Sequence, residues 1–148
     1  MDILFEKFQI DYGLEVEKMI INLYKEDPEG ESITREKIGD TFKQVMSFPE
    51  KCTIVVFKSS KDIVGYALLV FYWSNEYGGD ILNIDELYVK SDWRGKGIAS
   101  QFFKYLNEKY DEKVAAFGLE VTPSNKKALN YYKNLGFHET ENSHLIKN

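Results

Sequence analysis

The sequence has one cysteine, few prolines and no long apolar run. Cys52, alone among 148 residues, has no partner for an internal disulfide bond, which excludes a disulfide-stapled scaffold and favours a reducing cytoplasm. No segment approaches the roughly 18 uninterrupted apolar residues of a membrane span, so we expect no membrane partner. The N-terminal MDILFEKFQI has no basic stretch followed by an apolar one, so no signal peptide is expected.

The sequence also has fewer basic than acidic residues. Asp and Glu outnumber Lys and Arg by 24 to 19, and the formal net charge is −5. A nucleic-acid binder needs a basic face, so we expect no nucleic-acid partner. The composition, 43% hydrophobic and 15% aromatic, indicates a well-filled core. The length suits a single domain that takes in residues 1–148.

Hydrophobic periodicity predicts a mixed α/β domain around one central sheet. Thr34 is a suitable cap for the second helix, which Pro49 ends, and Gly136 stands where the cap of the last helix belongs. The expected order is strand 3–9, helix 14–24, the helix after Thr34, strands 52–57, 63–73 and 82–89, helix 98–110, strand 115–121, a helix opening at 122–125, and a short hairpin within 137–146.

A glycine-rich turn, WRGKGIAS at 93–100, lies between the third of those central strands and the next helix. It is not a Walker loop, because the sequence has no G-x-x-x-x-G-K followed by Ser or Thr. It fails the dinucleotide fingerprint as well, because Ser100 occupies the position of the third glycine. The pattern Arg/Gln-x-x-Gly-x-Gly/Ala is satisfied by Arg94, Gly97 and Ala99.

The chemistry of this turn suits an anion. Glycines let backbone N–H groups approach a pyrophosphate together, and the helix that follows contributes the positive end of its dipole. Arg94 and Lys96 would add positive charge. The alternative interpretation is an ordinary strand-to-helix turn, and the short motif alone does not exclude it.

Two stretches together resemble the Gcn5-related N-acetyltransferase superfamily: LYVKSDWRGKGIASQFF at 87–103 and NKKALNYYKNLGF at 125–137. The resemblance implies that the first stretch binds the pyrophosphate and pantetheine of acetyl-CoA, with no metal ion. It implies that the second stretch supplies the family's Asn, Ala, Tyr and Gly-Phe positions. The cofactor-binding residues expected from it are Leu87, Val89, Arg94, Gly95, Lys96, Gly97, Ile98, Ala99, Ser100, Asn125, Ala128 and Tyr132.

The strand ILNIDELYV contains the candidate general base. Its apolar residues change from even to odd positions across Asp85 and Glu86, which a regular strand cannot do, so we predict a β-bulge there. A carboxylate beside the acetyl group can accept the proton that an amine must lose. Asp85 is our first choice and Glu86 our second. For each acid, a purely structural role is the alternative.

Tyr132 is the candidate general acid, because it stands four positions before Gly136, as the family's tyrosine does. Its hydroxyl would protonate the leaving thiolate of CoA. The alternative is a core aromatic on the apolar face of its helix. The two histidines lie in the expected terminal hairpin, and no His/Cys cluster has zinc spacing.

The acceptor is the least constrained part of the prediction. Within the superfamily the central stretch looks more like diamine and polyamine acetyltransferases than like peptide-directed members, so a small primary amine is expected. Acidic residues of the first inter-helix loop would then face the distal charges of a polyamine. These residues are Glu26, Asp27, Glu29 and Glu31. The alternatives are a protein or peptide acceptor and a non-catalytic CoA-binding module. The resemblance also implies a homodimer, because dimers are frequent in the superfamily.

Overall fold

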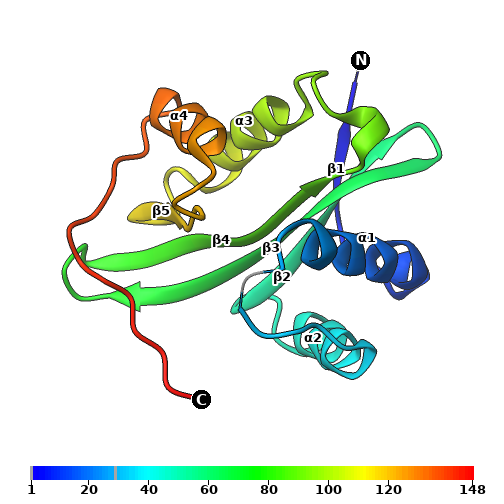
Figure 1. Cartoon of the computed structure of the whole chain (residues 1–148), viewed down its shortest axis with the longest axis horizontal. Coiled ribbons are helices and arrows are strands. Elements are labelled where there is room, and N and C mark those ends of the chain that lie inside the picture. The colour runs from blue at the N-terminus through cyan, green and yellow to red at the C-terminus, as the bar shows by residue number, and fades with distance from the viewer. Residues whose placement is uncertain (1, 29) are drawn as a thin grey trace.

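Five strands lie side by side in chain order in the computed structural model, which describes residues 2–28 and 30–148 (Figure 1). All neighbouring strands are antiparallel except β4 and β5, which run parallel. A parallel connection needs a crossover, and helix α3 supplies it. The strands are β1 (Leu4–Lys7), β2 (Cys52–Ser59), β3 (Asp62–Ser74), β4 (Gly79–Val89) and β5 (Ala116–Leu119).

Helices cover both faces of the sheet, α1 and α2 on one face and α3 and α4 on the other (Figure 1). Successive side chains of β3 point to opposite faces of the sheet and pack in two cores. Tyr66 and Leu68 pack on the α1 side, and Ala67 and Leu69 pack on the α3 side. The predicted mixed α/β fold is therefore confirmed. The helices are α1 (Gly13–Glu26), α2 (Arg35–Ser47), α3 (Ile98–Tyr110) and α4 (Lys126–Asn134), with 3-10 turns at Ile10–Tyr12 (η1) and Ser91–Trp93 (η2).

Local capping signals predicted the start of α2 correctly. Thr34 is its N-cap, and the Thr34 Oγ1 accepts a hydrogen bond of 3.2 Å from the backbone N–H of Lys37. The helix ends at Ser47, shortly before Pro49, whose ring and missing N–H prevent helical continuation. The second helix thus begins and ends where the sequence predicted.

Strand β4 contains one extra residue, Asp85. Leu68 of β3 pairs with Glu86 and Leu69 pairs with Ile84, so Asp85 lies outside the register. The predicted bulge is confirmed. It explains why the apolar residues are even-numbered before Asp85 and odd-numbered after Glu86. The β4 residues that pack in the α3-side core are Leu82, Ile84, Leu87 and Val89.

The predicted closing hairpin is wrong. Residues 138–148 form neither strand nor helix, and the segment runs from α4 past the end of the sheet toward the α2 side (Figure 1). Most of its side chains are polar, and its two large apolar ones, Leu145 and Ile146, are 89% and 84% exposed. With so little apolar surface to bury, an extra hairpin has no packing to stabilise it. In the described part of the chain, β5 is therefore the outermost strand beside β4.

Gly65 in β3 is required by a close approach of the backbone. A Cβ at this position would lie 2.5 Å from the Tyr88 carbonyl oxygen and 2.6 Å from Cδ2 of Phe57. We expect Gly65→Ala to reduce the free energy of unfolding by about 1–3 kcal/mol, the usual cost of overpacking. Urea unfolding monitored by circular dichroism measures it.

The same substitution in α2 is the control. A Cβ on Gly39 meets no atom within 4 Å, and the position is inside a helix. Gly39→Ala should therefore stabilise the protein, by about 0.5–1 kcal/mol. Equal effects of the two substitutions would contradict the packing argument.

Candidate functional site

The glycine turn, residues 94–97, connects η2 to the first residue of α3. Gly95 and Gly97 have φ angles of +73° and +81°, which L-residues rarely adopt, and a Cβ at either position would meet open space. Ile98 follows, with its side chain 2% exposed in the α3-side core. The buried Ile98 anchors the helix, and the two glycines leave the turn open on its outer side.

The first turn of α3 is suited to an anion. Gly97 is the N-cap residue and has no side chain to cap the helix. The leading N–H groups of α3 and the positive end of its dipole therefore remain for a ligand. Lys96 lies beside them, with its ammonium 5.1 Å from the centre of the Trp93 ring. The expected pyrophosphate of CoA fits the chemistry of this turn.

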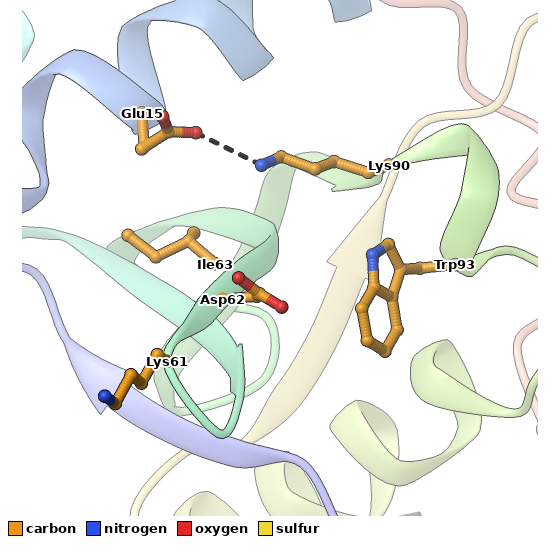
Figure 2. A pocket seen from close by; sticks show the side chains of 6 residues that line it. All are labelled: Glu15, Lys61, Asp62, Ile63, Lys90 and Trp93. Carbon is orange, nitrogen blue, oxygen red and sulfur yellow. Dashed lines mark hydrogen bonds and ion pairs between the residues drawn. The ribbon is translucent and has the colours of Figure 1, made fainter.

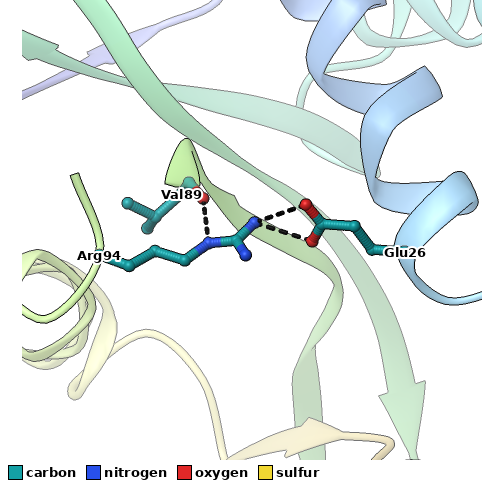
Figure 3. A network of polar contacts seen from close by, with 3 residues as sticks. All are labelled: Glu26, Val89 and Arg94. Atoms are coloured by element: carbon teal, nitrogen blue, oxygen red, sulfur yellow. Dashed lines mark hydrogen bonds and ion pairs between the residues drawn. The ribbon is translucent and has the colours of Figure 1, made fainter. Parts of the chain in front are cut away.

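Arg94 has partners within the chain. Its Nε donates to the Val89 carbonyl oxygen at 2.7 Å, and its Nη2 pairs with the Glu26 carboxylate at 2.8 Å (Figure 3). Its guanidinium also lies 5.2 Å from the centre of the Tyr88 ring. The charge that the sequence assigned to an external phosphate is thus shared with a carboxylate of α1.

The backbone of β4 beyond the bulge is open on the side away from β3. The backbone N–H of Lys90 donates to the Val64 carbonyl oxygen of β3. Backbone polar groups point alternately to the two sides of a strand, so the N–H and C=O groups of Val89 and Leu87 point away from β3. Pairing with β5 ends at Ile84 and Leu119. Leu87 and Val89 therefore have the backbone orientation that hydrogen bonding to pantetheine requires.

Glu86 lies on the α1 side of the sheet between two tyrosines. Tyr24 of α1 donates to its Oε2 at 2.6 Å, and Tyr66 of β3 donates to its Oε1 at 2.9 Å. Burial raises the pKa of the Glu86 carboxyl, and the two hydroxyl donors oppose that rise. Burial and the carboxylate together raise the pKa of both tyrosines, so their hydroxyls remain donors.

Asp85 lies next to Glu86, at the point where β4 and β5 separate. It follows Ile84, the last β4 residue paired with β5. The residue is exposed, yet partial desolvation by the surrounding chain raises the pKa of its carboxyl, and the negative charge of Glu120, just after β5, raises it further. A raised pKa makes a carboxylate a stronger proton acceptor.

Tyr132 lies on α4 within the α3-side core. Its ring packs edge-on against Phe103 and Phe137, at centroid distances of 5.9 and 6.0 Å. Burial raises the pKa of its hydroxyl, so the group is protonated at neutral pH. The neighbouring Tyr131 instead shares a hydrogen bond of 2.9 Å with Ser100 on α3. The packing of Tyr132 agrees with a core aromatic and leaves its proton available.

Asn125 and Ala128 begin α4. The Asn125 side chain accepts a hydrogen bond of 3.2 Å from the Ala128 N–H, as an N-cap does. This cap fixes the start of the helix that positions Tyr132. The two residues predicted to contact the cofactor therefore also have a structural role in the fold.

Sequence reasoning missed Tyr24, Tyr66 and Glu120. Tyr24 was recognised only as part of the apolar stripe of its helix, and Tyr66 only as an aromatic in a long strand. Their hydroxyls meet Glu86 across 62 and 20 sequence positions, so no local pattern marks them. The bulge was the one available signal, because it predicts that a side chain there turns toward α1.

The acidic loop does not present a row of free carboxylates. Glu26 is paired with Arg94, Asp27 accepts a hydrogen bond of 3.2 Å from Thr122, and Glu31 accepts one from Asn148. Glu29, also expected to bind a polyamine, lies outside the described residues. Each of the three described acids thus has a partner within the chain.

Two cavities flank α1. One of about 390 Å³ lies between the start of α1, the β2–β3 turn and the end of β4, where Lys90 donates to Glu15 at 3.1 Å (Figure 2). The hydrogen bond from Lys90, with its charge, holds the pKa of Glu15 below its ordinary value. The other, about 360 Å³, is lined by Tyr24, Ile33 and Glu31 among others. Tyr24 therefore connects this second cavity to Glu86.

Metal-ligating side chains do not gather at the site. Within residues 2–28 and 30–148, no three or more His, Cys, Asp or Glu side chains come together in a way that could hold a metal ion. His138 and His144 are exposed in the terminal segment. The helices of the same residues are all too short or too polar to cross a membrane.

The fold and the site together define an α/β domain that combines a glycine turn suited to an anion with a half-buried carboxylate. Comparison with known families is consistent with that class: residues 17–137 match the Acetyltransferase (GNAT) family. The chain belongs to this family, which confirms the resemblance found in the sequence.

Curated relatives match half of the chain. Thialysine N-epsilon-acetyltransferase of Sus scrofa is 40% identical over 75 residues, which cover 50% of this chain and 44% of that protein. The protein of the same name from Bos taurus is 37% identical over the same coverage. The matched stretch thus spans less than half the length of these relatives.

Solved structures share the fold over almost the whole chain. A possible acetyltransferase from Clostridium difficile 630 superposes with a TM-score of 0.85 at 24% identity and covers 99% of this chain and 97% of its own. AAC(6')-Iy, solved with the bisubstrate analogue CoA-S-monomethyl-acetylneamine, gives 0.80 at 12% identity, with 100% and 99% covered. At these identities the likeness concerns the fold.

The hydrogen bond from Tyr24 gives a direct test of the Glu86 site. A neutral O–H donor stabilises the charged carboxylate, so its loss favours the protonated acid. We expect Tyr24→Phe to raise the pKa of Glu86, measured by titrating the carboxyl ¹³C resonance. Tyr12→Phe is the control, because the Tyr12 hydroxyl donates to Glu6 at 2.6 Å instead. A Glu86 pKa that stays constant or falls in Tyr24→Phe would contradict the described geometry.

Proposed function

We propose that this protein is an acetyl-CoA-dependent N-acetyltransferase that acts on a primary amine of a small molecule. The observation that carries the proposal is the open glycine turn at the start of α3, which follows the strand whose bulge carries Asp85 and Glu86, in a chain of the GNAT family. A turn that binds a phosphate-bearing acyl donor and a base that activates an amine are the two parts that such a transfer requires.

Cofactor binding is proposed for the two segments predicted from the sequence. Backbone N–H groups of Gly97, Ile98 and Ala99 would face the pyrophosphate, and Lys96 would add charge. The outward backbone groups of Leu87 and Val89 would hydrogen-bond pantetheine. Asn125 and Ala128 would line the cofactor from the start of α4. The remaining residues proposed for this role are Arg94, Gly95, Ser100 and Tyr132.

The transfer itself needs a base and an acid. Asp85 would take the proton of the amine, directly or through a water molecule, and its raised pKa supports that role. The amine nitrogen would then attack the acetyl carbonyl, forming a C–N bond and a tetrahedral intermediate. As the C–S bond breaks, Tyr132 would protonate the thiolate of CoA. Glu86, fixed by two hydroxyls, is the alternative base.

A small amine is the acceptor that the comparisons favour. The curated relatives are named for acetylating thialysine at an amine, and AAC(6')-Iy was solved with an acetylneamine analogue. A diamine or polyamine belongs to the same chemical class and stays the narrower proposal. Protein or peptide acceptors are the second candidate. A homodimer in the cytoplasm completes the proposal, supported by the family resemblance and by the single cysteine.

Acetyl-CoA turnover with a mixed panel of amines tests this function. The panel contains thialysine, lysine, spermidine, an aminoglycoside and a lysine-containing peptide, with CoA release as the measurement. We expect turnover with at least one small amine and little with the peptide. Binding of acetyl-CoA without turnover of any amine would instead support the non-catalytic module.

Gly97→Glu tests the cofactor site in the same assay. The substitution places a side chain and a negative charge at a position with φ of +81°, beside the proposed pyrophosphate. We expect the loss of measurable CoA binding in calorimetry and of all turnover. Circular dichroism checks that the fold is retained. Unchanged CoA affinity in the folded variant would remove the glycine turn from the proposal.

Tyr132→Phe tests the proposed acid, because it keeps the ring and deletes the proton. We expect kcat to fall by about 10²-fold or more, with little change in acetyl-CoA affinity. Tyr131→Phe is the matched control, since its hydroxyl bonds Ser100, and it should keep kcat near wild type. Wild-type kcat in Tyr132→Phe would return Tyr132 to a core role.

Asp85→Asn should lose most activity at neutral pH and recover partly in alkali, where the amine deprotonates unaided.

A further inference from the structure

The ion pair between Glu26 and Arg94 joins the last turn of α1 to the glycine turn. Arg94 makes three contacts. Its Nη2 contacts the Glu26 carboxylate at 2.8 and 3.1 Å and its Nε donates to the Val89 carbonyl oxygen (Figure 3). Its guanidinium also lies 5.2 Å from the centre of the Tyr88 ring. Only the first of these contacts involves a negative charge. Glu26 is therefore the counter-ion of the arginine in this conformation.

This ion pair is open to solvent and easily exchanged. The side chains of Arg94 and Glu26 are 44% and 45% exposed. Exposed carboxylate pairs of this kind contribute about five-fold or less to an equilibrium. Glu26 is bound through Nη2 alone, whereas a pyrophosphate carries more negative charge and can accept two parallel N–H bonds from the planar guanidinium. A phosphate ligand at the glycine turn would thus compete with Glu26 for one cation.

Glu26 also stands at the edge of the carboxylate site. Tyr24, two positions earlier on the same turn of α1, donates to Glu86. Asp27, the next residue, accepts a hydrogen bond from Thr122 in the segment between β5 and α4. The end of α1 therefore contacts the glycine turn, the β4 carboxylate and the β5–α4 segment.

We infer that Glu26 is an internal competitor of the CoA pyrophosphate for Arg94, and that cofactor binding releases its carboxylate at the end of α1. The inference rests on the proposed function, because it needs CoA at the glycine turn. The empty enzyme keeps Arg94 neutralised by Glu26. In the loaded enzyme the pyrophosphate takes the arginine, and one more carboxylate becomes available to a cationic acceptor.

Because of this exchange, each substrate would raise the binding affinity of the other. Since the release of Glu26 accompanies CoA binding, an amine that uses the carboxylate binds better to the loaded enzyme, and by reciprocity the amine strengthens CoA binding by the same factor. The Glu26–Arg94 pair would favour an order of binding in which the cofactor comes first.

Calorimetry with CoA and with pantetheine, which lacks the pyrophosphate, tests the inference. If Glu26 competes for Arg94, Glu26→Gln should bind CoA about two- to five-fold more tightly than wild type, the range expected for an exposed pair. Its affinity for pantetheine should not change. Thermal unfolding confirms that the variant is folded, and the gain for CoA should shrink in high salt.

Two variants separate competition from a general change of charge. Glu17→Gln removes another α1 carboxylate, one that pairs with Arg35 at 3.0 Å, and Asp27→Asn neutralises the residue next to Glu26. Both change the net charge as Glu26→Gln does, but neither frees Arg94. We expect each to leave CoA affinity within about 1.5-fold of wild type, on the scale of exposed charges.

The outcomes are distinct. Equal or weaker CoA binding by Glu26→Gln would overturn the inference, because the pair would then position Arg94 and not withhold it. Equal tightening of CoA and pantetheine would overturn it as well, because the gain would not involve the pyrophosphate. A wild-type protein that binds neither ligand would contradict the proposed function itself.

Discussion

One extra residue in β4 determines the arrangement of the candidate site. Asp85 lies outside the pairing of β4 with β3, so the side chains before and after it change faces. Glu86 consequently points toward α1, while the apolar residues on both sides of the bulge keep packing under α3. Pairing with β5 also stops at Ile84. The bulge thus combines a half-buried acid, a backbone edge without a paired strand in the described chain, and the separation of two strands at one point of the sheet.

The half-buried Glu86 carboxylate depends on partners from other elements. An isolated ionised acid in this environment would be costly, and Tyr24 and Tyr66 offset that cost with one hydroxyl each. Tyr24 comes from the end of α1, so the position of this helix and the state of Glu86 are linked. The same helix end holds Arg94 through Glu26. The carboxylate site and the glycine turn are therefore connected through two residues of a single helical turn.

The described acids of the inter-helix loop link separate parts of the chain. As a sequence the loop looked like a surface for polycations, but in the fold its described acids hold Arg94, Thr122 and Asn148. The loop thus connects α1 to the glycine turn, to the β5–α4 segment and to the end of the chain. A cationic acceptor that bound one of these acids would have to replace its present partner. For Glu26 that partner is Arg94, which we infer is also taken up by the cofactor.

Much of the fold was determined by the sequence alone, because the relevant physics is local. Apolar periodicity specified the helices and the central strands, Thr34 specified a helix start, and the change of parity around Asp85 specified the bulge. Gly95 and Gly97 marked a turn with positive φ before α3. The terminal hairpin was mispredicted because this segment has too little apolar surface to pack against the sheet.

Only the tertiary structure decided which side chains meet. Tyr24 reaches Glu86 across 62 positions and Arg94 reaches Glu26 across 68, and no local pattern encodes either pair. Sequence motifs therefore predicted Arg94 as a cation for a phosphate but did not predict its present counter-ion. Long-range pairs depend on how α1 packs against the sheet, and that packing follows from burial of the whole apolar face of the helix, not from the few polar residues that it brings together.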